Sequence, residues 1–168
     1  MYLPWRVCKV SEEQENSLIS VKVVTNMDSN KKIRILIIDN NESVRIHLRI
    51  LLECVPEFEI IDEAEDGQTA LELTQKLLPD IVIMDSFSPF MNAFDVTKWI
   101  TSVLPATKVI AFVSSNDEIK MMIDSGASGL LHKACADKEI ISTVKAVSKK
   151  IELHQQKYNQ DNIFYSEP

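Results

Sequence analysis

Between Ile33 and Lys150 the sequence alternates five times between a short apolar run and a longer stretch with helical periodicity. The apolar runs are rich in isoleucine and valine, and four of the five are almost uninterrupted, which is typical of strands buried on both faces of a parallel sheet. We expect strands over Ile33–Ile38, Phe58–Asp62, Ile81–Met84, Val109–Val113 and Leu130–His132. The second of these has acidic neighbours and is expected at an edge of the sheet.

The stretches between the strands place apolar residues three and four positions apart, which predicts amphipathic helices. The first three helices are marked by Val44, Leu48, Leu51 and Leu52, by Ala70, Leu71, Leu73 and Leu77, and by Val96, Trp99, Ile100 and Val103. Two more are expected over Asp117–Asp124 and from Asp137 to about Lys149. Successive strand–helix units joined by right-handed crossovers predict a doubly wound α/β domain. Its five-stranded parallel sheet has the order 2-1-3-4-5, with helices on both faces.

The predicted domain occupies residues 33–150, with an extension on each side. Residues 1–32 carry apolar residues at alternate positions around a polar stretch, which fits either a small hairpin or an arm. Beyond the domain, Ile151, His154 and Tyr158 continue the helical spacing, so the last helix is expected to extend into the tail at 151–168. Only 18 residues follow Lys150, and no second folded module is expected there.

The composition is that of an ordinary but acidic globular protein. With 45% hydrophobic and 26% charged residues, the chain is not expected to be disordered throughout. Its formal charge of -7 repels phosphate backbones, which disfavours direct nucleic-acid binding. The three cysteines form no metal- or redox-type pair, and no apolar run has the length of a membrane helix or a secretory signal. We expect a cytoplasmic protein, either a monomer or a weak homodimer, that does not bind membranes.

Three chemically distinctive residues lie at the ends of predicted strands. Asp39 closes the first strand, Asp85 closes the third, and Lys133 follows the fifth. The first and third strands are neighbours at the switch point of this topology, so both carboxylates are expected in one crevice, within reach of the lysine. Paired carboxylates favour a hard cation such as Mg²⁺. An acid pair with a metal ion and a lysine suits a phosphoryl group.

Together with Asp39, Asp85 and Lys133, the pattern of residues 33–150 resembles the receiver domain of bacterial two-component response regulators. The matching stretches are Ile33–Asp39, Glu63–Glu72, Pro79–Asp85, Pro89, and the Gly-Ala-Ser-Gly run at 126–129 followed by Lys133. The sequence of these stretches is most similar to the subfamily whose members usually carry a C-terminal helix-turn-helix. Because the tail here is short, the resemblance suggests an atypical, stand-alone receiver.

The resemblance also implies roles for individual residues. Asp85 looks like the phosphoryl acceptor, Asp39 like an acidic ligand of Mg²⁺, and Lys133 like the counter-charge on the phosphoryl oxygens. The backbone carbonyl of Phe87 looks like a third metal ligand. The implied protein is a phosphoacceptor signalling domain and not an enzyme, with at most self-phosphorylation and self-dephosphorylation. Its implied partners are a histidine kinase or phosphotransfer protein and a downstream protein.

The sequence departs from the family pattern at the metal site and at the switch. Asn40 stands where the family usually has a second acid, so it is a weak ligand and the affinity for Mg²⁺ should fall. Val113 replaces the usual Ser or Thr that hydrogen-bonds the phosphoryl group, and Leu130 replaces the aromatic residue that moves on activation. Both partners of the hydroxyl–aromatic switch are missing, so phosphorylation is expected to change the fourth helix and fifth strand only slightly.

Two versions of this function stay open. In the preferred one, Asp85 is phosphorylated by a histidine kinase that docks beside Arg45 and Arg49, and the output is carried by protein contacts. In the alternative, a pseudo-receiver binds partners without phosphorylation. A flavodoxin-type cofactor binder shares the topology but needs a Ser/Thr- or Gly-rich phosphate loop, which the acidic segment 39–42 does not supply. A DNA-binding regulator is disfavoured by the charge and the short tail.

Overall fold

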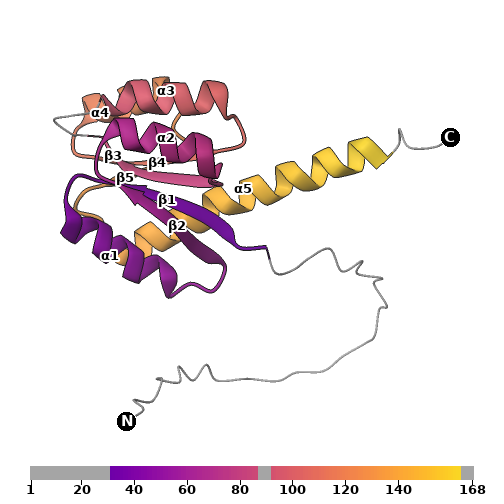
Figure 1. Ribbon diagram of the computed structural model, residues 1–168, viewed down its shortest axis with the longest axis horizontal. Coiled ribbons are helices and arrows are strands. Elements are labelled where there is room, and N and C mark those ends of the chain that lie inside the picture. The colour runs from indigo at the N-terminus through magenta and orange to yellow at the C-terminus, as the bar shows by residue number, and fades with distance from the viewer. Residues whose placement is uncertain (1–30, 87–91, 164–168) are drawn as a thin grey trace, which may run out of the picture.

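The computed structural model describes residues 31–86 and 92–163, and within them five helices surround a five-stranded parallel sheet (Figure 1). The elements in chain order are β1 (Ile33–Ile38), α1 (Glu42–Glu53), β2 (Phe58–Ala64), α2 (Gly67–Leu77), β3 (Ile81–Asp85), α3 (Ala93–Val103), β4 (Lys108–Val113), α4 (Asn116–Asp124), β5 (Gly129–His132) and α5 (Asp137–Ile163). The strand order is β2-β1-β3-β4-β5, which confirms the predicted fold class and topology.

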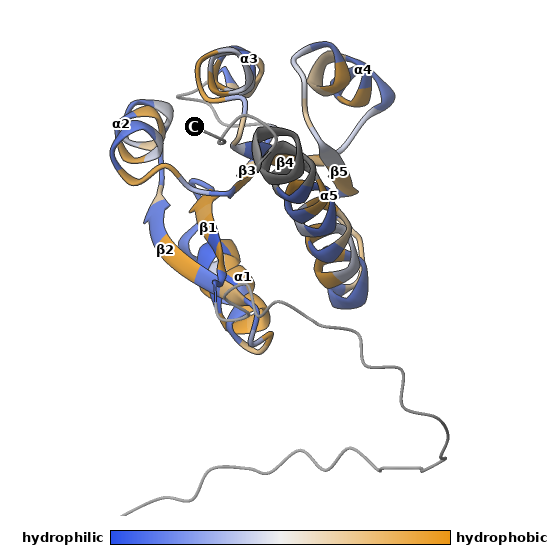
Figure 2. Cartoon of the chain, turned by 90° about the vertical axis from the view of Figure 1, so that its right-hand side faces the viewer, coloured by the Kyte–Doolittle hydropathy of each residue, from blue (hydrophilic) through white to orange (hydrophobic). Residues whose placement is uncertain are grey.

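Burial of the strands follows from their positions in the sheet. β1, β3 and β4 are almost completely buried because helices cover both of their faces. β2 lies at the edge and has several exposed or half-buried residues, and Figure 2 shows hydrophilic stretches along it where β1 is hydrophobic. It runs two residues further than the sequence indicated, to Ala64, because its end stays paired with the end of β1.

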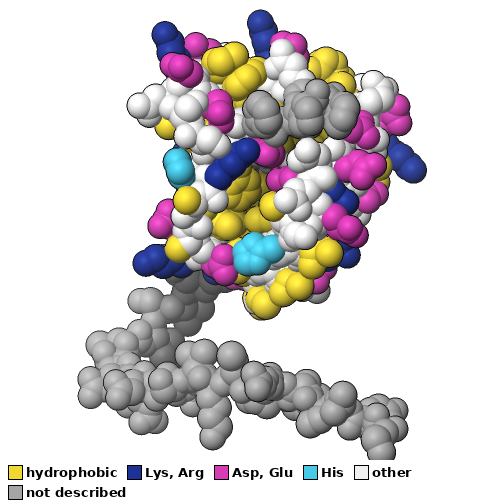
Figure 3. All heavy atoms as spheres, turned by 90° about the vertical axis from the view of Figure 1, so that its left-hand side faces the viewer, with side chains coloured by type: hydrophobic (Ala, Val, Ile, Leu, Met, Phe, Trp, Pro, Cys, Tyr) yellow, Lys and Arg dark blue, Asp and Glu magenta, His cyan; other side chains and the backbone are white. Residues whose placement is uncertain are grey.

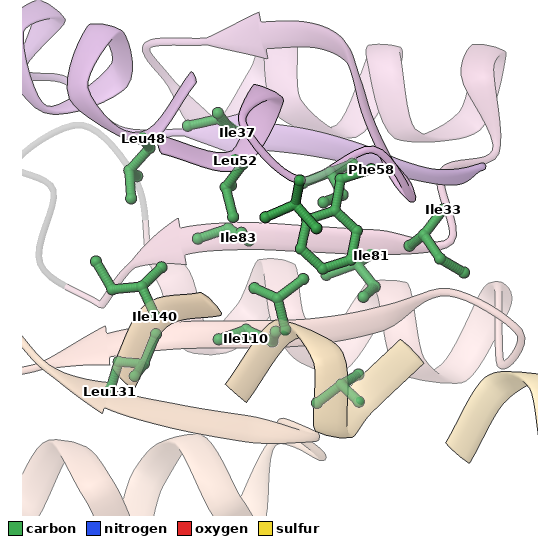
Figure 4. Close-up of a cluster of buried hydrophobic side chains, with 14 of the residues drawn as sticks. Ile33, Ile37, Leu48, Leu52, Phe58, Ile81, Ile83, Ile110, Leu131 and Ile140 are labelled. Carbon is green, nitrogen blue, oxygen red and sulfur yellow. The ribbon is translucent and has the colours of Figure 1, made fainter. Parts of the chain in front are cut away.

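Two hydrophobic clusters close the two faces of the sheet. α1 and α5 cover one face, where Leu48, Leu52 and Ile140 pack onto inward-facing isoleucines of the central strands (Figure 4). The second cluster lies under α2, α3 and α4 and includes Ala70, Val96, Ile100 and Met122. Full burial of each large aliphatic side chain contributes about 1.5–3 kcal/mol, so these clusters are the main stabilising feature of the domain. The charged residues Asp39 and Asp85 lie at the ends of strands, outside these clusters.

Side-chain caps fix where the helices begin. Each of α1 to α4 starts after a residue whose side chain accepts a backbone N–H of the first turn, and these residues are Asn41, Asp66, Asn92 and Ser115. Such caps stabilise a helix by about 1 kcal/mol. The caps of α1 and α4 follow β1 and β4 within three residues, which holds the loops at the C-terminal edge of the sheet in short, defined paths.

The helices end where the sequence indicated. α2 ends before Pro79 and α3 before Pro105, since proline cannot continue a helix. After α4, Gly126 has φ +92°, a left-handed conformation that disfavours other residues, and a Cβ there would lie 3.0 Å from the Thr101 hydroxyl oxygen. This glycine turns the chain from α4 back toward β5.

The last helix is longer than the domain needs. The predicted core of this helix ended near Lys149, whereas α5 spans 27 residues and continues past the sheet in Figure 1. Val147 and Ile151 are still buried against the domain. The predicted extension of the last helix is thereby confirmed. The hairpin or arm expected at the N-terminus falls on residues 1–30, outside the described residues. Among the helices described, none combines the length and apolar character of a membrane span.

Candidate functional site

The C-terminal edge of the sheet brings together the three residues that the sequence singled out. Asp39 follows β1, Asp85 is the last residue of β3, and Lys133 follows β5. Nζ of Lys133 lies 2.7 Å from Oδ1 and 2.9 Å from Oδ2 of Asp85, so the ammonium group contacts both oxygens of this carboxylate. All three residues line one cavity. The predicted juxtaposition is therefore present in the structure.

Asp39 is held in a state that favours a bound cation. Its side chain is nine-tenths buried, and this burial raises the pKa of the carboxyl group, with the nearby charge of Asp85 adding to the rise. The backbone N–H of Asn41 donates to Oδ1 at 2.8 Å and acts in the opposite direction. Among the described residues, no group donates a hydrogen bond to Oδ2. A cation beside this oxygen would offset the cost of burying the charge.

The donor set suits a hard ion but is small. Asp39 and Asp85 offer carboxylate oxygens, which Mg²⁺ prefers, and Asn40 is exposed at the same cavity with an amide oxygen. Within the described residues, no group of three His, Cys, Asp or Glu side chains is placed to hold a metal. The carbonyl of Phe87, the further ligand that the resemblance implied, lies outside the described residues. The residues present fit Mg²⁺ with two charged ligands.

A cavity of about 510 Å³ extends from the acidic mouth between α1 and α5. Its apolar wall is formed by Leu48 of α1, Phe112 of β4 and Ile140 of α5. Figure 3 shows a hollow with hydrophobic side chains at its base and charged side chains around it. At the rim, Nε2 of His47 lies 3.0 Å from Oδ1 of Asp137, which links the two helices across the opening. Asp85 lines this cavity and is itself largely buried, with 12% of its side chain exposed.

Glu118 is a residue near the site that the sequence analysis missed. Its Oε2 atom accepts a hydrogen bond from the Ser86 hydroxyl at 2.5 Å and from the Ser114 backbone N–H at 2.8 Å. The Ser86 hydrogen bond is the main reason that the pKa of Glu118 is lowered, and the charge of Lys133 also contributes. The available signal was the spacing of Ser115 and Glu118, which is that of a capping box at a helix start.

The two degenerate switch positions belong to the core and not to the cavity. Val113 is 2% exposed within the cluster under α2, α3 and α4, and Leu130 is half-buried against the same cluster. Neither residue lines the cavity. A valine has no hydroxyl to offer, and the neighbouring Ser114 presents its backbone N–H to Glu118. The structure thus contains an apolar contact where the resemblance placed a polar switch.

The arginines proposed as a kinase-docking face have a role inside the domain. Nε of Arg45 lies 3.2 Å from Oε2 of Glu63 on β2, and Nε of Arg49 lies 2.6 Å from Oε1 of the same glutamate. Arg45 also donates to the backbone carbonyl of Asp39 at 2.7 Å, and its side chain is only 14% exposed. Arg45 therefore fixes the loop that carries Asp39, while Arg49 is half-exposed and remains accessible.

The fold and the acidic crevice define an α/β domain of the kind that handles phosphoryl groups at a sheet edge. The family model of the response regulator receiver domain matches residues 35–145. The chain belongs to the response regulator receiver family, whose members are non-enzymatic signalling modules of two-component systems.

Relatives and solved structures agree with this assignment. The transcriptional regulatory protein LiaR of Bacillus subtilis is 36% identical over 119 residues, which cover 70% of this chain and 56% of LiaR. The receiver domain of NarL from Mycobacterium tuberculosis is 27% identical, with a TM-score of 0.65 over 73% of this chain and 98% of that domain. CheY in the CheX–CheY–BeF₃–Mg²⁺ complex of Borrelia burgdorferi shares the fold, with 22% identity and a TM-score of 0.66 over 71% of this chain and 92% of that one. The chain spans about half the length of the curated relatives it matches.

Proposed function

We propose that this receiver accepts a phosphoryl group on Asp85 from a histidine kinase or a phosphotransfer protein. The observation that carries the proposal is the contact of Lys133 Nζ with both carboxylate oxygens of Asp85 at the mouth of an open cavity. A carboxylate at that position is a nucleophile that a donor can reach, and the adjacent ammonium group supplies a fixed positive charge.

The chemistry requires little from the protein beyond positioning and charge. An oxygen of Asp85 attacks the phosphorus of the donor, a P–O bond forms, and the P–N bond to the donor's imidazole breaks with its electron pair leaving on nitrogen. Negative charge on the phosphoryl oxygens develops beside Lys133, which is 37% exposed and can follow them. His47 of α1 and Asp137 at the start of α5 lie at the rim of the cavity, where a donor side chain would enter.

Receiver domains typically bind Mg²⁺ at the phosphorylation site, and the residues present here fit that ion. Asp39 and Asp85 would hold it, with Asn40 as a weak ligand and the carbonyl of Phe87 as an expected one. The bound ion supplies positive charge that neutralises the phosphoryl oxygens. Replacing an acid by Asn40 removes one negative charge from the site, so the affinity for Mg²⁺ is lower than in receivers with a complete acid pair.

The output of the domain is proposed to pass through contacts with a downstream protein. The formal charge of -7 opposes direct binding to a phosphate backbone. The receiver unit is proposed to comprise residues 33–150 of a cytoplasmic protein, with 1–32 and 151–168 as extensions. A phosphorylation-independent pseudo-receiver is the second candidate, and the specific observation in its favour is Val113, which is buried and has no hydroxyl for a phosphoryl group.

Intact mass spectrometry tests the proposal. The full chain is incubated with Mg²⁺ and acetyl phosphate, alongside Asp85→Asn and the control Asp124→Asn, which removes an exposed aspartate at the end of α4. The wild type and the control should gain the mass of one phosphoryl group, which hydroxylamine removes as expected of an acyl phosphate, and Asp85→Asn should gain none. Absence of the gain in the wild type favours the pseudo-receiver, and its persistence in Asp85→Asn places the acceptor elsewhere.

A further inference from the structure

Glu118 connects α4 to the residue that follows the acceptor. It is the third residue of α4, and one oxygen of its carboxylate binds both the hydroxyl of Ser86 and the backbone N–H of Ser114. Ser86 is next to Asp85 in the chain, and Ser114 is the first residue after β4. A single carboxylate oxygen therefore joins the loop after β3, the loop after β4 and the first turn of α4.

This contact goes beyond ordinary helix capping. In a capping box, the side chain of the N-cap residue accepts the N–H of the third helical residue, and that residue's carboxylate returns to the N–H of the cap. The first half is present, since the Ser115 hydroxyl oxygen accepts the N–H of Glu118 at 3.2 Å. The carboxylate, however, binds Ser114 and also reaches Ser86, which lies 32 residues away in the chain. Helix formation alone does not require the contact with Ser86.

The donors held by Glu118 lie beside the acceptor. Asp85 pairs with Phe112 in the sheet register, and the Ser86 N–H donates to the Phe112 carbonyl at 2.9 Å, so the two strand ends run together. The Lys133 N–H donates to the last residue of β4 at 3.0 Å, which brings Lys133 to the same corner. Because Lys133 helps to lower the pKa of Glu118, this carboxylate shares the positive charge that Asp85 also uses.

We propose that Glu118 is a resident anion that occupies the hydrogen-bond donors beside Asp85 and is displaced when Asp85 carries a phosphoryl group. The inference rests on the proposed phosphorylation of Asp85. A phosphoryl group brings more negative charge than the carboxylate it modifies, so it competes for Ser114 and Lys133 and repels Glu118. Displacement frees the first turn of α4. The missing hydroxyl at position 113 and ring at position 130 predicted only a slight change in α4, whereas this displacement couples Asp85 to the first turn of α4 by another route.

The same geometry makes Glu118 an inhibitor of phosphoryl binding. Removing its carboxylate leaves the Ser114 N–H and the positive charge of Lys133 to the incoming group. Charge-assisted hydrogen bonds are among the stronger ones in proteins. Once Glu118 no longer occupies these groups, a phosphoryl analogue should bind about tenfold more tightly. Glu118→Gln removes the charge and keeps the shape, so its effect should be intermediate.

The test is a titration of the full chain with beryllofluoride and Mg²⁺, followed by amide NMR. Wild type, Glu118→Ala and Glu118→Gln are compared with Asp117→Asn, which removes an exposed acid from the same helical turn without touching the loops. We expect affinity to rise about tenfold in Glu118→Ala and to change less than about twofold in the control. In the wild type, beryllofluoride should shift the amides of residues 114–119, and in Glu118→Ala these amides should already be shifted before it is added.

Equal affinity in wild type and Glu118→Ala, or equal tightening in Asp117→Asn, overturns the inference while leaving acceptance at Asp85 intact. Absence of beryllofluoride binding in every protein overturns the proposed function and this inference with it. If Glu118→Ala does not fold, Ser86→Ala keeps the glutamate and weakens its hold, and it should tighten binding by a smaller factor; unchanged binding in that variant contradicts the inference.

Discussion

The two sides of Asp85 hold their carboxylates in opposite ways. On the α1 side, Asp39 is buried with one oxygen that accepts no hydrogen bond from the described residues, and its pKa is raised chiefly by that burial. On the α4 side, the carboxylate of Glu118 accepts from two donors, and its pKa is lowered chiefly by the Ser86 hydroxyl. A cation could therefore bind the second oxygen of Asp39. The carboxylate of Glu118 already has its hydrogen bonds within the protein. These environments fit our proposals that a cation binds on the α1 side and that Glu118 is displaced on the α4 side.

Lys133 lies between the two sides, and its removal should have the largest effect. Its ammonium group contacts Asp85 and contributes to the lowered pKa of Glu118, and it opposes the rise in the pKa of Asp39 that burial causes. Lys133→Met should slow phosphorylation by a small phosphodonor by about 10²-fold or more, the usual loss when one positioned stabilising group is removed. The measurement is the rate of phosphoryl incorporation by intact mass, with Lys120→Met as the control because this lysine is exposed on α4. A rate close to that of the wild type would show that the ion pair is structural.

Metal binding on the α1 side can be tested by restoring the second acid at position 40. Asn40→Asp adds a carboxylate at the mouth of the cavity and should tighten Mg²⁺ binding by about tenfold, because Mg²⁺ depends on few charged ligands. Metal titration monitored by amide NMR measures the change. Asn116→Asp adds the same charge at an exposed position on α4 and should have little effect. Equal or weaker metal binding in Asn40→Asp would mean that position 40 does not face the ion.

The smallest effects should appear in the pH dependence of stability, with opposite signs for the two acids. The folded-state pKa of Glu118 lies below its ordinary value of 4.5, so its contribution to stability is present above that pH and lost as pH falls through the folded pKa. The folded-state pKa of Asp39 lies above 3.8, so folding is favoured below that pH and the favour is lost as pH rises through the folded pKa.

These signs predict the behaviour of two neutral variants without metal. At neutral pH, Glu118→Gln should be less stable than the wild type and Asp39→Asn more stable, and both differences should shrink as the pH is lowered past the respective windows. Urea unfolding in the presence of a chelator, at neutral and acidic pH, measures both. Two variants that change stability in the same direction at neutral pH would show that the carboxylates are held alike.

Much of the fold could be predicted from particular residues. The apolar runs at Ile33–Ile38 and Ile81–Met84 indicated strands buried on both faces, and the sheet confirms them. The acidic run beginning at Phe58 indicated an edge strand, which β2 is. These signals are local, because burial on two faces and helical spacing both leave a direct pattern in the order of residues.

Contacts between distant residues left weaker signals. Arg45 and Arg49 share a helix face and suggested a docking surface, but the structure pairs both with Glu63 of β2. The capping spacing of Ser115 and Glu118 was present in the sequence, yet only the packing of loops brings Ser86 to the same carboxylate. In both cases the partner lies on another element, so its identity depends on the register and direction of elements far apart in the chain.

The sequence by itself determined the five strand–helix units, the strand order and the placement of Asp39, Asp85 and Lys133 at one edge, because topology sends the C-terminal ends of parallel strands to the same place. Only the tertiary structure decided how those charges are balanced. Whether folding favours or disfavours the ionised form of a carboxylate depends on its burial and on the hydrogen-bond donors near it. Both are set by residues from separate loops. That is why Asp39 and Glu118, on the two sides of Asp85, have pKa values shifted in opposite directions.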